Sequence, residues 1–570
     1  MSFSVLQIVI DHPGRSAGLA LGLIGLAVFV DWFHLAPRRS PLYNLPGPRL
    51  ESYLYGNAKD IIKLEVGVAH SHLEAVYGPT FVYRGMLGQP RLYSADPKVF
   101  NHLMSQAYDY PKPWHIRKVL GSIVGDGLLS SEGETHRRQR RIILPAFSAQ
   151  AIRELFPIFL DKAMELTEKM TEEAAKKDGP TDGSEAEGEK AGPSRLVSEG
   201  VDVMFWIGRA MLDVIGLAGF DYDFDSIEKE SNELSIAYKT MFDGLSGQST
   251  LGVLQDLFPV LNYIRTERQA IRDRAMMTVN RYGRDILARK KKAVLDLSVG
   301  VDGGKGLGKA DVQGKDILSS LVRANMATDL AEQNRLGDEE VLAQISTLLL
   351  AGFETSSTAL TWMLHSLSTR PEIQNKLRDE LLKVETSEPS LDELNALPYL
   401  DAFVKESLRF TPPAPGTMRV AAKDDIISLS EPIKGRDGKL MTEIYVPKGT
   451  TMFVPIMRIN RAAHMYGKDD ADIFRPERWL EPMPRSVMDL DVPYGHQATF
   501  LGGPRGCIGY RFALAEIKAF LFVILRQLTF ESVVPAIDYE HRANMVQRPR
   551  VKGKKEEGFH MKLQVRSVKD

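Results

Sequence analysis

The sequence predicts a mainly α-helical protein with small β-sheets, and three observations support this fold class. Most of the chain repeats apolar residues at the helical period, and residues 338–367 are apolar on most faces, as in a helix that crosses a core. Strand-like alternation occurs only in short patches, such as 80–97, 450–456 and 558–565. Apolar residues make up 44% and charged residues 26% of the 570 residues, a balance typical of one large globular unit.

The first element, residues 16–35, is an apolar segment that we interpret as a membrane anchor. Its uncharged run, 16–30, is shorter than a bilayer span, but the whole segment reaches the roughly 20 residues that a span requires. A cleaved signal peptide has an apolar core of similar length, but no small-x-small cleavage site follows here. We therefore expect residues 1–36 to form a retained anchor. Arg38 and Arg39 favour a cytosolic position for the chain that follows.

The proline-rich residues 37–56 are expected to form a hinge, and residues 57–570 a single domain. Two stretches of this domain, 171–197 and 298–315, read as disordered surface insertions. The first is acidic and lacks aromatic residues, and the second contains six glycines. Neither can bury enough apolar surface to offset the entropy of ordering it.

Two strands are expected within 80–97, joined at Gly88 and Gln89. Asp96 and Pro97 then predict the start of the next helix, because aspartate caps helix N-termini and proline suits the first helical position. The rest of the chain is expected to be helical, apart from the strand patches at 450–456 and 558–565.

Composition excludes several classes of protein. The net charge is −2, so no basic field suggests binding to nucleic acid. The single cysteine, Cys507, excludes an intramolecular disulfide and argues against a structural zinc site. No phosphate-binding Gly-x-x-x-x-Gly-Lys loop is present. Scarce cysteine is typical of a reducing, cytosol-facing compartment.

The helix that we expect to begin with Asp338 as its cap carries polar residues inside an apolar rod. Gly352 costs roughly 1 kcal/mol relative to alanine in mid-helix, and Glu354 risks burying a charge. Such departures from local rules tend to mark functional sites. The alternative is a glycine packing contact beside an exposed glutamate, and this helix alone does not decide between the two.

Cys507 lies in a glycine-rich loop directly before a predicted helix. The loop has the spacing Phe-x-x-Gly-x-Arg-x-Cys-x-Gly, formed by Phe500, Gly503, Arg505, Cys507 and Gly509. Backbone N–H groups and the dipole at a helix N-terminus favour a thiolate over a thiol. The glycines allow the backbone to approach a flat group closely, and the arginine supplies a fixed positive charge.

This loop resembles the haem-binding loop of the cytochrome P-450 superfamily of haem-thiolate monooxygenases. The resemblance implies the cytochrome P-450 fold and haem b (iron protoporphyrin IX) as cofactor. It further implies that Cys507 is the axial ligand of the haem iron, that Phe500 shields the sulfur and that Arg505 contacts a propionate. Gly503 would allow close approach of the backbone.

Other marks of the family follow in the expected order. Glu406 and Arg409 in "KESLR", with Arg478 in "FRPERW", resemble the family's buried structural ion-pair cluster. The segment "GETHRRQRR" resembles its Trp-x-x-x-Arg helix, with His136 in place of the usual tryptophan and Arg140 at the arginine. Histidine and tryptophan both carry a ring N–H, so His136 can still donate a hydrogen bond to a propionate.

Arg419 in "PGTMRVA" stands where many members of the family contact a propionate. On the predicted central helix, the resemblance makes Glu354 and Thr355 the catalytic acid and alcohol, which supply protons for cleavage of the O–O bond. It also implies that Gly352 leaves room for oxygen. Without the family resemblance, Arg140, Arg419 and Arg505 would be interpreted as ordinary surface arginines.

The resemblance extends from residue 45 to the C-terminal strand and is greatest to fungal microsomal members. It implies a monooxygenase of the endoplasmic reticulum membrane, single-pass, with its catalytic domain in the cytosol. Electrons would come from NADPH through a separate NADPH–cytochrome reductase, with cytochrome b5 as a second donor. Arg511 and Lys518 are candidate docking charges. The implied substrate is a lipophilic small molecule, in secondary metabolism such as terpenoid tailoring.

Two alternatives remain at this stage. One keeps the fold and changes the chemistry to a haem-thiolate isomerase or dehydratase that acts on a peroxide and needs no reductase. The Glu354–Thr355 pair argues against it, because members of that kind tend to lack the pair. The other is a haem-free membrane scaffold or redox-sensing thiol protein, for which a change at Cys507 would have no effect on haem.

Overall fold

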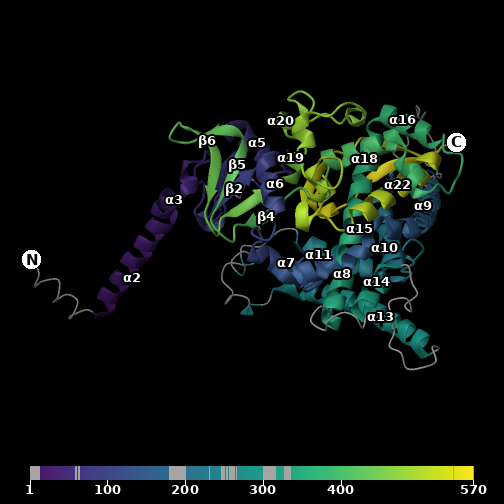
Figure 1. Ribbon diagram of the computed structural model, residues 1–570, viewed down its shortest axis with the longest axis horizontal. Coiled ribbons are helices and arrows are strands. Elements are labelled where there is room, and N and C mark those ends of the chain that lie inside the picture. The colour runs from purple at the N-terminus through teal and green to yellow at the C-terminus, as the bar shows by residue number, and fades with distance from the viewer. Residues whose placement is uncertain are drawn as a thin grey trace, which may run out of the picture. The chain divides into compact units, whose positions relative to one another are not determined.

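The computed structural model describes residues 13–568, apart from 58, 60, 62–63, 179–199, 230–231, 246–250, 252–254, 256–262, 265, 300–315, 327–334 and 544. Helices dominate these residues and the sheets are small, as the sequence predicts (Figure 1). The chain divides into two compact units. The first unit consists of residues 1–111 and 416–455, and the second of residues 112–415 and 456–570.

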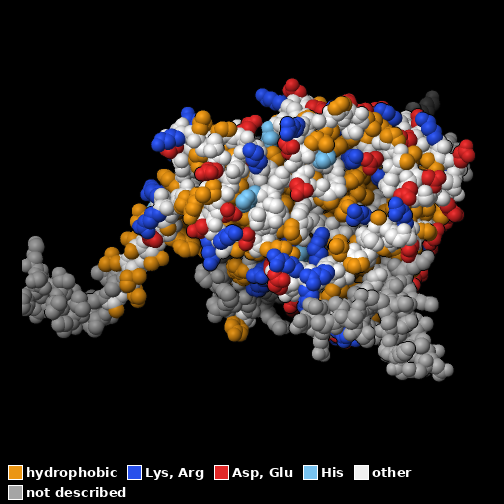
Figure 2. All heavy atoms as spheres, viewed as in Figure 1, with side chains coloured by type: hydrophobic (Ala, Val, Ile, Leu, Met, Phe, Trp, Pro, Cys, Tyr) orange, Lys and Arg blue, Asp and Glu red, His pale blue; other side chains and the backbone are white. Residues whose placement is uncertain are grey.

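The first unit begins with the apolar helix α2 (Pro13–Val30), continued by a π-helical turn (Asp31–Leu35) and α3 (Ala36–Arg39). Residues Leu21–Arg39 are long and apolar enough to cross a membrane, and only a small share of them is buried. Figure 2 shows apolar side chains along this segment. Its exposed apolar residues include Leu21, Leu23, Ile24 and Leu26. The second helix of comparable length and hydropathy among the described residues, Val203–Phe220, is mostly buried and belongs to the core.

A four-stranded sheet and a separate hairpin form the rest of the first unit. The sheet order is β1 (Thr80–Arg84), β2 (Pro90–Ser94), β7 (Thr451–Val454) and β4 (Thr417–Val420), with β2 and β7 parallel. The hairpin pairs β5 (Asp425–Lys434) with β6 (Leu440–Val446). The first unit also contains the helices α5 (Val68–Tyr77) and α6 (Pro97–Ser105). As predicted, Asp96 caps α6, where its Oδ1 accepts from the Lys98 N–H at 2.8 Å.

The proline-rich segment packs closely on the first unit. The Val82 N–H of β1 donates to the Pro46 carbonyl at 2.9 Å, and Leu42 and Leu45 are buried. A Cβ on Gly47 would lie 1.9 Å from the Val82 carbonyl oxygen, so only glycine allows this approach.

The second unit is a helical assembly with two small sheets. One sheet has the order β3 (Val201–Asp202), β11 (Lys562–Ser567), β8 (Leu528–Ser532), and β9 (Tyr539–Ala543) pairs with β10 (Gln547–Val551). Its longer helices are α7 (Trp114–Val124), α8 (Gly133–Ile143), α9 (Ala149–Asp178), α10 (Val203–Phe220), α11 (Glu233–Leu245), α13 (Glu267–Val299), α14 (Ile317–Met326), α15 (Asp338–Ser368), α16 (Pro371–Leu381), α18 (Pro398–Phe410) and α22 (Tyr510–Gln527). Shorter ones are α17 (Leu391–Asn395), α19 (Ile456–Ile459), α20 (Ala463–Tyr466) and α21 (Arg485–Met488).

Helix α15 lies in the middle of this unit (Figure 1) and packs on α10. Most of its residues are buried, as the apolar pattern predicts. A Cβ on Gly352 would lie 2.7 Å from the Ile215 side chain of α10, so a larger residue would force that side chain to move. The packing interpretation of Gly352 therefore has direct support. The same alternative predicted an exposed glutamate, and this part is wrong because Glu354 is buried.

Two sequence predictions need correction. The N-cap of α15 is Gly337, and Asp338 is the first helical residue; the Glu340 side chain accepts from the Gly337 N–H at 3.2 Å. Residues 171–178 of the first expected insertion continue α9, and residues 298–299 of the second end α13. The local acidic and glycine-rich composition did not indicate how far the preceding helices extend. The remainder of each insertion lies outside the described residues.

Candidate active site

The cysteine loop is a tightly turned segment that leads into α22. It contains two 3-10 turns, Ala498–Phe500 and Gly503–Arg505, and the Cys507 N–H donates to the Phe500 carbonyl at 2.8 Å. Gly503 has φ +59°, a left-handed conformation that favours glycine. The loop therefore returns on itself and places Cys507 three residues before the first helical residue of α22.

The Cys507 side chain is exposed to solvent. Even so, enough protein surrounds the sulfur that burial raises the pKa of the thiol. The Gly509 N–H and the positive charge of Arg140 act in the opposite direction and favour the thiolate.

Two arginines connect the cysteine loop to α8 and the residues before it. Arg140 of α8 donates to the Gly506 carbonyl at 2.9 Å. Arg505 donates to the Ser131 carbonyl at 2.9 Å and forms an ion pair with Glu132. Glu132 also accepts from the Lys112 ammonium at 3.0 Å. Sequence reasoning missed Glu132 and Lys112, because only the fold shows that they meet the loop.

His136 lies on α8 and is buried. Burial, together with the nearby charges of Lys112 and Arg140, lowers the pKa of His136 to about 4, so the ring is neutral at neutral pH. A neutral imidazole keeps one N–H donor. His136 can therefore take the hydrogen-bonding role that the family gives to tryptophan.

Arg419, on β4 of the first unit, is 3% exposed. Its guanidinium donates to the Thr417 hydroxyl and the Met418 carbonyl, both at 2.8 Å, and no described carboxylate pairs with it. Burial lowers the pKa of Arg419 to about 10. A buried cation that contacts only neutral oxygens is suited to receive an anionic group.

Glu406, Arg409 and Arg478 come together as a fully buried cluster. Arg409 forms a bidentate pair with Glu406 at 2.8 Å for both contacts, and Arg478 Nε lies 3.1 Å from each carboxylate oxygen. The Trp479 indole N–H and the Arg475 backbone N–H also donate to Glu406, at 3.0 and 2.7 Å. This geometry matches the structural role that the resemblance gives these residues.

The acid and alcohol of α15 have different partners. The Thr355 hydroxyl donates to the Ala351 carbonyl one turn earlier, at 2.7 Å. Glu354 is buried in an ion pair with Arg548 of β10. No local pattern could indicate Arg548 as the partner, since 194 residues separate it from Glu354.

A second buried acid, Glu516 of α22, was also missed. It is wholly buried, and burial raises its pKa to about 8. The Ser356 hydroxyl of α15 counteracts this shift as a hydrogen-bond partner, although neither Oε atom makes a well-formed hydrogen bond within the described part of the chain. In the sequence, a glutamate among apolar helix residues is the only hint of this group.

Two further expectations have different outcomes. Lys518 is 3% exposed, and its ammonium bonds Asp401 and Asn395, both at 2.9 Å, so it is not a docking charge. Arg511 is exposed and lies over the Tyr510 ring. It remains a candidate for docking a redox partner.

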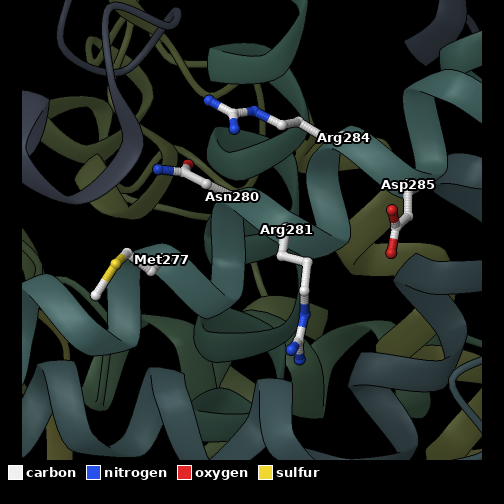
Figure 3. A pocket seen from close by; sticks show the side chains of 5 residues that line it. All are labelled: Met277, Asn280, Arg281, Arg284 and Asp285. Atoms are coloured by element: carbon white, nitrogen blue, oxygen red, sulfur yellow. The ribbon is translucent and has the colours of Figure 1, made fainter.

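A pocket on α13 is unrelated to these residues. Figure 3 shows its lining, which comes from one helix: Met277, Asn280, Arg281, Arg284 and Asp285. Arg281 pairs with Glu233 of α11 and is largely exposed. No predicted site residue lines this pocket, and it is not the candidate active site.

The donor set around Cys507 fits a haem. A haem brings an iron that accepts a thiolate, a flat macrocycle and two propionate carboxylates. Arg140 and Arg505 make hydrogen bonds at the cysteine loop in the second unit, and neutral His136 lies one turn before Arg140 on α8. Arg419, in the first unit, has the buried and anion-free surroundings that a carboxylate would satisfy.

Comparison with known proteins gives the same identification. The family model described as Cytochrome P450 matches residues 45–553. The chain is similar to "Cytochrome P450 monooxygenase 205" of Postia placenta, with 40% identity over 96% of this chain and 97% of that protein. It is 38% identical to "Cytochrome P450 monooxygenase 128" of the same fungus, over 93% of this chain and 94% of that protein.

A relative from another fungus, "Cytochrome P450 monooxygenase claW" of Ampulloclitocybe clavipes, is 34% identical over 96% of both chains. The similarity thus covers the cysteine loop, the ion-pair cluster and α15 together. The chain belongs to the cytochrome P450 family and is a monooxygenase whose cofactor is haem b, bound through a cysteine thiolate.

Proposed function

We propose that this protein is a membrane-anchored monooxygenase that inserts one oxygen atom into a lipophilic small molecule, with Cys507 as the haem ligand. The observation that carries the proposal is the cysteine loop. Its Cys507 N–H is bonded within the loop, and Arg140 holds its Gly506 carbonyl at 2.9 Å. In the bound state, the haem supplies oxygen activation, assisted by electron donation from the thiolate.

The chain's own residues hold the cofactor and supply protons. His136, Arg140, Arg419 and Arg505 bind the propionates, and Phe500, which is buried beside the loop, shields the sulfur. Gly503 allows the turn of the loop. Glu354 and Thr355 pass protons from solvent toward the oxygen-binding face of α15, and such positioned transfer typically contributes about 10²–10⁴-fold.

Location and partners follow from the same proposal. Residues 21–39 anchor the protein in a membrane, because an exposed apolar helix of this length is stable in lipid. The proposal assigns this anchor to the endoplasmic reticulum membrane and the catalytic units to the cytosol. Electrons come from NADPH through a separate reductase, with cytochrome b5 as a second donor. The relatives named above are fungal monooxygenases, and the proposal places this protein in fungal secondary metabolism, such as terpenoid tailoring.

A reduced carbon monoxide spectrum tests the ligand assignment. We expect the purified protein to show the red-shifted Soret band of thiolate-ligated haem, and Cys507→His to show an unshifted band with haem still bound. Arg511→Ala, which alters an exposed residue outside the loop, is the matched control and should keep the shifted band. An unshifted band in the unaltered protein would remove Cys507 from its role.

Product profiling addresses the substrate. Extracts of an expressing fungal strain, compared with the same strain carrying Cys507→Ala, should differ by an oxygenated lipophilic compound. The reductase requirement separates a monooxygenase from a peroxide isomerase, since the product should disappear when NADPH or the reductase is withheld. Product formation from a peroxide without NADPH would favour the isomerase.

A further inference from the structure

The hairpin β9–β10 is docked along one side of α15. His541 stacks on Trp362 with ring centroids 3.8 Å apart and planes 10° apart. The Trp362 indole N–H donates to the Gln547 carbonyl at 2.9 Å. One turn further along the helix, His365 meets the Tyr539 ring edge-on at 5.9 Å. The hairpin and the helix therefore form one continuous interface.

This interface also holds Glu354. Arg548 donates through Nε to Glu354 Oε1 at 2.6 Å, and its Nη2 lies 2.5 Å from the same oxygen. The two side chains are 8% and 5% exposed. Eleven residues, about three helical turns, separate Glu354 from His365, so both lie on the same side of α15. No donor from the described residues contacts Oε2 of Glu354.

Hydrogen bonds to the segment after α18 hold the strand that carries Arg548. The Gln547 N–H donates to the Pro413 carbonyl at 2.8 Å, and its side-chain amide donates to the Pro412 carbonyl at 2.5 Å. Phe559 lies 5.7 Å from the Arg548 guanidinium. Arg548 is therefore placed by the backbone next to it and by packing, as well as by Glu354.

The other charged groups of the hairpin pair with one another. Glu540 accepts from Arg542 at 2.9 Å and from Arg550 at 2.8 Å. This leaves Arg548 as the hairpin cation that faces α15 at Glu354.

The histidines of the interface are neutral at neutral pH. Burial, with nearby Arg461, lowers the pKa of His541 to about 3. Burial, with nearby Arg370, lowers the pKa of His365 to about 4. Neither adds positive charge to the Glu354 environment above pH 5.

We propose that Arg548 is a positioning residue for proton supply, which keeps Glu354 ionised and fixed so that Oε2 exchanges the proton. The proposal rests on the relay role given to Glu354 above. Arg548 occupies Oε1, so the incoming proton is taken up at Oε2, and the carboxylate is restored when that proton is passed on. A buried carboxylate deprived of its cation would instead favour the neutral acid.

The test compares Arg548→Gln with Arg550→Gln, a matched control that removes an arginine of the same strand from a different glutamate. Haem content is first measured from the reduced carbon monoxide spectrum. Infrared difference spectra at neutral pH then report protonated carboxyl groups. We expect Arg548→Gln to show a new carboxylic acid band that is absent in Arg550→Gln. The band should vanish in Arg548→Gln/Glu354→Gln, which separates it from the Glu516 carboxyl.

The kinetic readout is NADPH oxidation with the reductase and no added substrate, measured across pH. We expect Arg548→Gln to slow it by about 10²-fold or more, the lower end of the range for positioned proton transfer, and to introduce a pH dependence that the double variant loses. Absence of the band together with an unaltered pH profile would overturn the proposal. A second outcome separates the two roles. If the band appears, but Glu354→Gln alone leaves the rate of NADPH oxidation and its solvent isotope effect unchanged, Glu354 is not a proton relay. Arg548 would still keep Glu354 ionised.

Arg548→Lys keeps the proposal testable if the glutamine variant does not incorporate haem. Lysine retains the charge but lacks the planar guanidinium. We expect no carboxylic acid band, an unchanged pH profile and slower NADPH oxidation. A rate equal to that of the unaltered protein would show that the position of the cation is unimportant.

Discussion

Glu406 and Glu516 are both wholly buried carboxyl groups of the second unit, but their surroundings are opposite. Glu406 receives bonds from two arginines, an indole N–H and a backbone N–H. Among the described residues, Ser356 is the hydroxyl that acts on Glu516 and no charged group pairs with this carboxyl, and burial raises its pKa to about 8. The same residue type is therefore bound by arginines in one place, whereas in the other place burial favours its neutral form.

The largest effect is expected from the charged cluster. Arg409→Met should lower the free energy of unfolding by about 3–5 kcal/mol, because it leaves Glu406 buried with too little positive charge. Urea denaturation of the haem-loaded protein measures this loss.

The matched control is Lys405→Met on the same helix. Lys405 pairs with Asp401 at 2.7 Å, but both side chains are about a quarter exposed. Its loss should cost less than about 1 kcal/mol. Equal losses for the two variants would contradict a stabilising role of the cluster.

Glu516→Gln should change how stability depends on pH. Because the pKa of Glu516 is about 8 in the fold against an ordinary value of 4.5, the folded state binds more protons than the unfolded state between these values. Stability therefore falls as pH rises through this window, by at most about 1.4 kcal/mol per unit. The glutamine variant should lack this contribution and be the more stable protein at pH 8.

Denaturation at several pH values between 5 and 9 checks this, with Glu540→Gln as a control. Glu540 is a carboxylate paired with arginines, and its pKa is lowered. It should not produce the same gain at high pH. Parallel pH profiles for the unaltered protein and Glu516→Gln would show that Glu516 is not a neutral acid.

The smallest effect is expected for Ser356→Ala. Loss of this hydroxyl should raise the pKa of Glu516 further, because Ser356 lowers it. The cost in stability should be about 1 kcal/mol. Ser357→Ala is the control, since its hydroxyl bonds the Glu354 carbonyl of its own helix at 3.2 Å. The pH range over which stability falls ends at the pKa of Glu516 in the folded state. This upper end should move to higher pH in Ser356→Ala and stay unchanged in Ser357→Ala.

Much of the fold and part of the site could be predicted from local patterns. The long apolar helix, the strands of 80–97 and the Asp96 cap depend on neighbouring residues, and each is present in the structure. The spacing of the cysteine loop likewise pointed to a turn before a helix. Glu406, Arg409 and Arg478 could be grouped only through the order of family motifs, because 72 residues separate the acid from Arg478.

The remaining features depend on long-range contacts that no local pattern contains. Arg548 reaches Glu354, and Glu132 reaches Arg505, only because distant segments pack together. Lys518 could not be separated from exposed Arg511 on the same helix without its buried partners. The N-cap of α15 in the structure lies one residue before the predicted one, because Gly337 and Asp338 are both acceptable N-caps before an acidic first turn.

The stacking of His541 on Trp362 has an optical consequence. The chain has five tryptophans. Among the contacts of the described residues, Trp362 has its indole covered by a parallel imidazole and bonded to the hairpin backbone. Separation of the hairpin from α15 would expose this indole to water and alter its fluorescence. Trp362 is therefore a built-in fluorophore for that interface, and no dye is needed to follow it.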